Sequence, residues 1–181
     1  MRLYVIGGKA RSGKTTFGIM LREELKKYGY KPCVMHITEP LYNYAENYFN
    51  YDKNKDDKPR EFLQQLGIQI IKEKMNKKTF LIDRLCEDID ILSNFFDCFI
   101  ITDARLIMEF DILKEKFDDV ITIYIERNNV DDKLTDEERH HITETEVSLY
   151  PSYDYKIIDK SLEEETQIVE NIVKETEARI W

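Results

Sequence analysis

The chain has 181 residues, of which 42% are hydrophobic and 35% charged, a balance typical of a single globular domain. Acidic residues number 36 against 27 basic ones, and the resulting net charge of −9 argues against nucleic acids or anionic membranes as partners. No stretch reaches the roughly 18 apolar residues of a membrane-spanning helix, and the short apolar start lacks the cleavage pattern of a signal peptide.

Five short apolar runs predict β-strands. They are Leu3–Gly7, Cys33–Thr38, Cys98–Thr102, Val120–Ile125 and Tyr155–Ile158. Most are continuous rather than alternating, which is typical of strands buried on both faces of a parallel sheet. Stretches with apolar residues at helical spacing lie between and after them and predict helices. These are Thr15–Tyr28, Pro59–Met75, Phe80–Phe96 and Ser161–Ile180. The alternation predicts right-handed βαβ units in an α/β sandwich.

Two stretches interrupt this pattern. Residues 42–58 are rich in Tyr, Asn, Lys and Asp and predict an exposed connection. Their aromatic side chains nevertheless recur at roughly helical spacing, so they could pack as a helix or stack on a ligand base. Residues 128–151 are highly charged and are the predicted place for a lid. The cysteines, Cys33, Cys86 and Cys98, are far apart and form no CxxC, which predicts reduced thiols in a cytoplasmic protein.

A phosphate-binding loop follows the first predicted strand. Residues 8–15, GKARSGKT, match the pattern G-x-x-x-x-G-K-[ST] and lead into a predicted helix. Glycines allow a tight turn whose N–H groups face an anion, and the start of the helix adds a favourable dipole. In this pattern the lysine reaches the β- and γ-phosphates of ATP, and the Thr hydroxyl ligates Mg²⁺. The residues predicted to bind ATP here are Gly8, Arg11, Ser12, Gly13, Lys14, Thr15 and Thr16.

The metal also needs an acid. Asp103 ends the apolar strand Cys98–Thr102, at the carboxyl edge where parallel sheets bind ligands, so it is the predicted metal acid. Asp83 competes for this role, but the apolar spacing around it is helical, which predicts an acid on a helix surface. Residues 54–57, NKDD, match a guanine-binding pattern of switch GTPases, yet they precede the metal-acid strand and no glycine follows Gly67, so we interpret the match as chance.

A kinase that transfers a phosphoryl group to a phosphorylated acceptor requires further cations, for the acceptor phosphate and for the transferred charge. Several arginines stand at predicted strand ends, helix starts or in the predicted lid, although any single one could be a solvated surface group. They are Arg11, Arg60, Arg105, Arg127 and Arg139. Arg127 follows the fourth strand and is a predicted ATP-binding residue. Gln64 lies one turn after Arg60 on the same helix face and could bond a base edge or a phosphate.

The motif set resembles that of phage-type deoxynucleoside monophosphate kinases. The resemblance is carried by residues 8–15, 59–67, 102–105 and 141–146, which occur in the family order. Many family members have Asp where this chain has Thr15, so this residue departs from the pattern towards the usual metal ligand. The same motifs are more loosely similar to those of phosphomevalonate and dephospho-coenzyme A kinases. The acceptor therefore stays open, as does a nucleotide-binding regulatory protein without an acceptor.

The resemblance implies a three-layer P-loop kinase fold with a five-stranded parallel sheet of order 2-3-1-4-5. It also implies one domain over residues 1–181, an acceptor-binding helical region at 39–76 and a lid at 128–151. The implied reaction transfers the γ-phosphate of ATP, with Mg²⁺, to a (deoxy)nucleoside monophosphate. A small-molecule nucleotide is thus the expected partner. A homodimer is possible, and the sequence leaves the oligomeric state open.

The family pattern also implies a role for each matching residue. Lys14 and Thr15 would bind the ATP phosphates and the metal, and Asp103 would hold the metal through water. Arg60 and Arg105 would face the acceptor phosphate. Arg139 would be the lid arginine, and His141 with Glu144 and Glu146 is expected to connect lid and core through polar contacts rather than to bind a metal.

Overall fold

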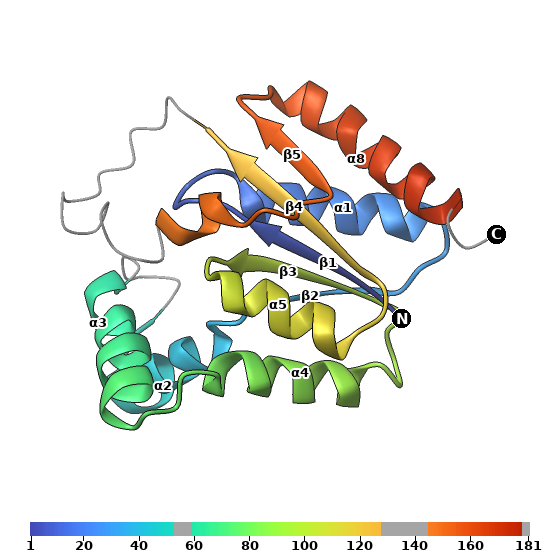
Figure 1. Cartoon of the computed structure of the whole chain (residues 1–181). Helices are drawn as coiled ribbons and strands as arrows, with labels where there is room; N and C mark the ends of the chain where they lie inside the picture. Colours follow the sequence, from blue (N-terminus) through green and yellow to red (C-terminus); the bar gives the residue numbers. More distant parts are fainter. Residues whose placement is uncertain (53–58, 128–144, 179–181) are drawn as a thin grey trace.

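The computed structural model describes residues 1–52, 59–127 and 145–178. Five parallel strands form one sheet in the order β2-β3-β1-β4-β5, as Figure 1 shows. The strands are β1 (Arg2–Gly7), β2 (Pro32–Met35), β3 (Cys98–Ala104), β4 (Val120–Glu126) and β5 (Tyr155–Ile158). The helices are α1 (Lys14–Lys27), α2 (Glu39–Phe49), α3 (Arg60–Gln64), the π-helix η1 (Gln65–Lys74), α4 (Phe80–Leu92), α5 (Ile107–Lys116), the 3-10 helix η2 (Glu146–Leu149) and α8 (Leu162–Ala178).

Helices cover both faces of the sheet, so the central strands are buried on both sides. In β1, Leu3 and Val5 join a core with α4 and α5, whereas Tyr4 and Ile6 join a second core with α1 and α8. Figure 1 shows α1 and α8 together on one side and α4 and α5 on the other. The three layers and the sheet order agree with the predicted fold.

The predicted strands match the observed ones closely, apart from β2, which ends at Met35 because the chain then turns into α2. The prediction of an exposed connection from residue 42 is wrong for residues 42–49, which belong to α2 and bury Ala45. The aromatic spacing within this stretch was the correct signal. Helix α5 was not predicted, since Phe110 and Leu113 are its only fully buried apolar residues.

A capping box begins α8. The backbone N–H of Ser161, the residue before the helix, donates to Oε2 of Glu164 at 2.8 Å. Hydrogen bonds from the Ser161 backbone and the neighbouring Lys160 lower the pKa of Glu164 to about 2. None of the three cysteines is paired. Across the described residues, no helix has the length and apolar character needed to cross a membrane.

Helix α1 approaches β3 unusually closely because position 18 has no side chain. A Cβ atom added to Gly18 would overlap the Cγ2 of Thr102. This contact holds the start of α1 next to the carboxyl end of β3. The phosphate-loop pattern and the predicted metal acid, far apart in sequence, are therefore held together by backbone packing.

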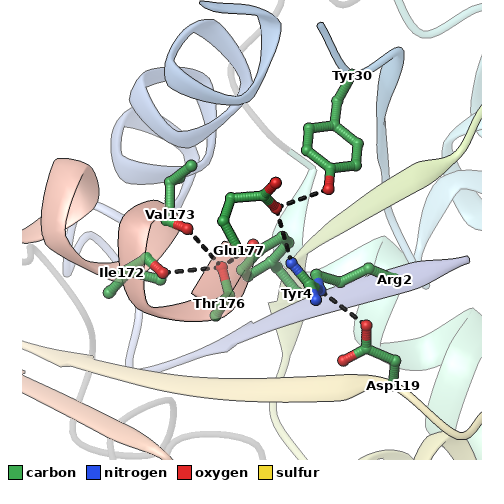
Figure 2. A network of polar contacts seen from close by, with 8 residues as sticks. All are labelled: Arg2, Tyr4, Tyr30, Asp119, Ile172, Val173, Thr176 and Glu177. Atoms are coloured by element: carbon green, nitrogen blue, oxygen red, sulfur yellow. Dashed lines mark hydrogen bonds and ion pairs between the residues drawn. The ribbon is translucent and has the colours of Figure 1, made fainter. Parts of the chain in front are cut away.

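A buried arginine ties the opposite end of the sheet to the C-terminal helix (Figure 2). Arg2 is only 5% exposed. Its Nε donates to Asp119 Oδ2 at 2.7 Å, and its Nη1 donates to Glu177 Oε1 at 3.1 Å. The Tyr30 hydroxyl donates to the same Glu177 oxygen at 2.6 Å. One guanidinium thus joins β1, the turn before β4 and the end of α8.

Tyr4 extends this network into the core. Its hydroxyl lies 2.8 Å from Thr176 Oγ1, which in turn lies 2.8 Å from the carbonyl oxygen of Ile172 (Figure 2). Burial raises the pKa of Tyr4 to about 12, so the phenol stays neutral and able to hydrogen-bond. The network lies at the amino ends of the strands, away from the carboxyl edge, and its role is to fix α8.

Replacing Arg2 should therefore cost stability. Arg2→Ala leaves the Glu177 carboxylate without its cation and should lower the free energy of unfolding by about 2 kcal/mol in urea titrations. Arg22→Ala is the matched control, because Arg22 pairs with its neighbour Glu23 in an exposed ion pair. That control should change stability by about 0.5 kcal/mol or less. Equal losses in the two variants would contradict the role assigned to the network.

Candidate active site

A cavity of about 740 Å³ lies at the carboxyl edge of the sheet. It extends from the loop after β1, past the ends of β2 and β3, to the helices α2, α3 and η1. The lining combines apolar and polar side chains, and its residues include Ser12, Lys14, Thr15, Thr16, His36, Thr38, Leu41, Tyr42, Glu46, Leu63, Gln64, Ile68, Lys72, Leu81, Asp103, Arg105 and Glu109. Its volume lies within the roughly 300–1,000 Å³ of small-molecule sites.

The loop between β1 and α1 has the backbone that the phosphate-binding pattern predicts. Gly13 adopts a left-handed conformation with φ 96°, and Arg11 does so with φ 58°. Gly8 has φ 151°, and a Cβ atom there would overlap the carbonyl oxygen of Ile125. Glycine at position 8 lets the loop pack against the end of β4. This turn directs the chain into α1, whose first residue is Lys14.

The side chain of Lys14 folds over this loop. Its Nζ donates to the carbonyl oxygens of Gly8 at 2.7 Å and Lys9 at 2.5 Å, and lies 3.4 Å from Ser12 Oγ. Lys14 is 7% exposed and lines the cavity. The loop thus holds an ammonium group at the place where the pattern expects phosphate. Next to it, Thr15 and Thr16 reach the cavity from the first turn of α1.

Asp103 reaches the cavity from β3, but it also has a structural task. Its Oδ1 accepts from the backbone N–H of Ile37 at 2.8 Å, and its Oδ2 accepts from the N–H and hydroxyl of Thr38 at 3.1 and 2.6 Å. An ionised carboxylate has about four acceptor positions, so one is left on Oδ1. That remaining position is available to a water molecule or to a metal ion.

The same hydrogen bonds fix the entrance to α2. Ile37 and Thr38 connect β2 to this helix, which forms one wall of the cavity. Asp103 therefore joins the predicted metal site to the predicted acceptor region. The sequence offered no signal for this link, because Thr38 and Asp103 lie 65 residues apart in the chain and nothing in either stretch points to the other.

Two glutamates hold the turn after β3 that carries Arg105. Glu109 Oε2 accepts from the N–H groups of Arg105 at 2.8 Å and Leu106 at 3.0 Å. Glu146 Oε1 accepts from the N–H of Ile107 at 2.7 Å. Burial raises the pKa of Glu109, although these N–H groups and nearby Lys72 oppose the shift. Glu146 thus makes the polar contact with the core that was expected for its motif.

The far wall of the cavity comes from α2, α3 and η1. Gln64, Ile68 and Lys72 recur at four-residue intervals along α3 and η1 and all line the cavity. Gly67 allows this wall to approach α2, since a Cβ atom there would lie 3.1 Å from Leu41 Cδ1. Burial lowers the pKa of Lys72, and Glu109 and Glu146 counteract the shift. Lys72 and Glu46 are polar lining residues that the sequence did not single out.

The structure brings most predicted site residues together. Nine of them line the cavity, and seven of these come from the phosphate loop, the start of α1 and α3: Arg11, Ser12, Gly13, Lys14, Thr15, Thr16 and Gln64. Asp103 and Arg105 join them from the end of β3, whereas Asp83 is exposed on α4, as expected. Gly8 and Arg127 lie outside the cavity lining. Arg60 is the first residue of α3.

Other predictions lie outside the described residues. These are Arg139, His141, Glu144, residues 128–144 of the predicted lid, and the chance match at 54–57. Within the part of the chain that is described, no group of three His, Cys, Asp or Glu side chains is arranged to hold a metal. The predicted magnesium site consists of Thr15 and Asp103, together with phosphate oxygens of a nucleotide.

Comparisons with known proteins bear on the fold. No family model and no curated protein matches the chain. Among solved structures, a Mycobacterium tuberculosis APS kinase in complex with AMPPNP and APS is 12% identical, covering 96% of this chain and 97% of that chain with a TM-score of 0.58. An Acinetobacter baumannii shikimate kinase in complex with shikimate is 14% identical, covering 99% and 94% with a TM-score of 0.54. The chain therefore has the fold of P-loop kinases, as predicted.

Lys14 offers a direct test of the phosphate loop. Lys14→Ala removes the charge that is predicted to reach the β- and γ-phosphates and should lower ATP-dependent turnover about 10²–10³-fold. The fold should persist, because Lys14 lines the cavity at the edge of the sheet and does not belong to either hydrophobic core. Circular dichroism and the unfolding midpoint check this. Turnover close to that of the wild type would contradict the role of Lys14 in binding the ATP phosphates.

Asp103 can be tested for its two tasks separately. Asp103→Asn should weaken Mg²⁺-dependent ATP binding, and added Mg²⁺ should restore part of it. Thr38→Val removes one donor to Asp103 and leaves the carboxylate charge, so ATP binding should keep its Mg²⁺ dependence. Asp83→Asn is the exposed control. If Asp83→Asn impairs ATP binding and Asp103→Asn does not, the metal acid has been assigned to the wrong residue.

Proposed function

We propose that this protein is a P-loop kinase that transfers the γ-phosphate of ATP to a (deoxy)nucleoside monophosphate. The observation that carries the proposal is one continuous cavity that joins the phosphate loop to the wall formed by α2, α3 and η1. A protein that only binds a nucleotide needs the part of this cavity at the phosphate loop. The part lined by α2, α3 and η1 gives room for an acceptor beside the phosphates.

Cations stand where two anionic substrates would meet. Lys14 lies in the loop, and Arg105 follows Ala104, which pairs with Gly7 at the end of β1. Lys72 adds a third cation from the opposite wall. A dianionic monophosphate beside a triphosphate requires such fixed positive charge against mutual repulsion. This arrangement supports a phosphorylated acceptor.

The rest of the cavity supports an acceptor with a flat, partly apolar group. Leu41, Leu63 and Ile68 offer apolar surface, while Tyr42 and Gln64 offer hydrogen-bonding groups. A nucleobase needs this combination of flat apolar contact and a few polar partners. The motif resemblance to deoxynucleoside monophosphate kinases points in the same direction.

In the proposed reaction an acceptor phosphate oxygen bonds to the γ-phosphorus of ATP while the bond to the β,γ-bridging oxygen breaks. Lys14 and Arg105 would balance the charge on the transferred group, and Asp103 would orient water bound to the metal. Mg²⁺ would supply further positive charge, held by Thr15 and phosphate oxygens. Catalysis would then consist of positioning and electrostatics, with no covalent link to the enzyme.

A substrate panel tests the acceptor. ATP and Mg²⁺ should give acceptor-dependent ADP release with deoxynucleoside monophosphates, and Lys14→Ala should abolish most of it. Arg105→Ala should lower kcat/KM for the acceptor about tenfold or more with little change in the KM for ATP. Arg22→Ala, which changes an exposed arginine of α1, is the charge-matched control.

The panel also contains ribonucleoside monophosphates, phosphomevalonate and dephospho-coenzyme A. Turnover only with one of the last two would overturn the nucleotide acceptor and leave the P-loop kinase intact. Slow ATP hydrolysis that no acceptor stimulates would instead indicate a regulatory nucleotide-binding protein.

A further inference from the structure

An ion pair stands beside the phosphate loop, outside the cavity. Arg127 follows β4, and its Nη2 lies 2.9 Å from Oε1 of Glu165 in the first turns of α8. The two partners differ in exposure, since the side chain of Arg127 is 35% exposed and that of Glu165 only 1%. A buried carboxylate thus holds a cation that remains accessible from solvent.

The arginine also packs against the loop itself. A Cβ atom on Gly13 would lie 3.1 Å from Nη2, 3.3 Å from Cζ and 3.4 Å from Nε of Arg127. These near-equal distances mean that the guanidinium lies with one face over Gly13, just before the first residue of α1. Gly13 and Glu165 therefore determine where the charge stands, and a side chain at position 13 would displace it.

This position is on the other side of the loop from the acceptor region. The cavity extends towards β2 and β3, whereas Arg127 follows β4, which lies on the opposite side of β1. Within the described residues, the Glu165 pair is the one hydrogen bond that Arg127 makes, so Nε and Nη1 have donors to offer. An arginine with an exposed face and unused donors suits a nucleotide bound to the loop.

Stability alone does not account for Glu165. Burying a carboxylate is costly, and an ion pair with a partly exposed arginine repays this cost incompletely. Moreover, its Oε2 is buried without a hydrogen-bond partner in the described part of the chain. A hydrophobic residue would serve the packing of α8 better, so the carboxylate has to be explained by what it does to Arg127.

We propose that Glu165 is a positioning residue that holds Arg127 in place for the donor nucleotide. This inference rests on the proposed function only in that the loop binds ATP, and it is independent of the acceptor. Glu165 does not touch the nucleotide in this arrangement and acts through the arginine. Its effect should therefore appear in ATP affinity and leave acceptor affinity unchanged.

The sign of the effect distinguishes positioning from simple electrostatics. Removing a negative charge near a polyanionic ligand strengthens binding if the charge acts only through its field. If Glu165 positions Arg127, Glu165→Gln weakens ATP binding instead, by about three- to tenfold in the dissociation constant measured by calorimetry without an acceptor. Glu163→Gln removes the same charge from an exposed residue of the same helix turn and should leave binding unchanged or slightly tighter.

A double-mutant cycle completes the test. Arg127→Ala should raise the dissociation constant about tenfold, and adding Glu165→Gln should change it no further, since the glutamate acts through the arginine. Glu165→Ala, which cannot accept the hydrogen bond, provides a second variant, and all measurements are made well below each unfolding midpoint. The proposal is overturned if both Glu165 variants bind ATP as tightly as the wild type or more tightly. It is also overturned if the losses of ATP affinity caused by Arg127→Ala and by Glu165→Gln add in the double variant. A wild type that does not bind ATP would overturn the proposed function as well, whereas failure of every acceptor would leave this inference standing.

Discussion

Parallel pairing of β1 with β3 is the constraint on which the whole site depends. It places the end of β1, where the phosphate loop begins, beside the end of β3, where Asp103 and Arg105 stand. Gly18 helps to keep the start of α1 next to β3, because the missing side chain of this glycine lets α1 lie directly on Thr102. Residues about 90 positions apart in the chain thereby share one cavity. Without this pairing, the loop would be an isolated anion site with no acid nearby.

The site is also a junction between structural elements. Asp103 links β3 to the start of α2, and Glu109 and Glu146 together hold the turn that carries Arg105. These carboxylates satisfy backbone N–H groups that would otherwise face a cavity. The cost of burying these carboxylates is offset by the hydrogen bonds that they accept, three at Asp103, two at Glu109 and one at Glu146. This explains why acidic side chains recur at an edge expected to bind anions.

Local patterns predicted the elements whose chemistry is local. The phosphate loop depends on glycines, a lysine and a following helix in one short stretch, so its position, its turn and the burial of Lys14 all follow from neighbouring residues. Continuous apolar runs likewise predicted the strands to within a few residues. By contrast, α5 has little apolar periodicity, because charged residues make up half of it and one of them, Glu109, is buried, so apolar spacing did not predict this helix.

The sequence by itself determined the glycine-rich turn after β1, the parallel α/β class and the places of Asp103 at a strand end and of Asp83 on a helix surface, because each depends on adjacent residues or on the spacing of apolar ones. Only the tertiary structure decided which distant groups meet. The contact of Thr38 with Asp103, the approach of Lys72 to Glu109 and the pairing of Arg127 with Glu165 all join separate elements. No short-range pattern encodes such contacts, since they depend on strand order and helix packing.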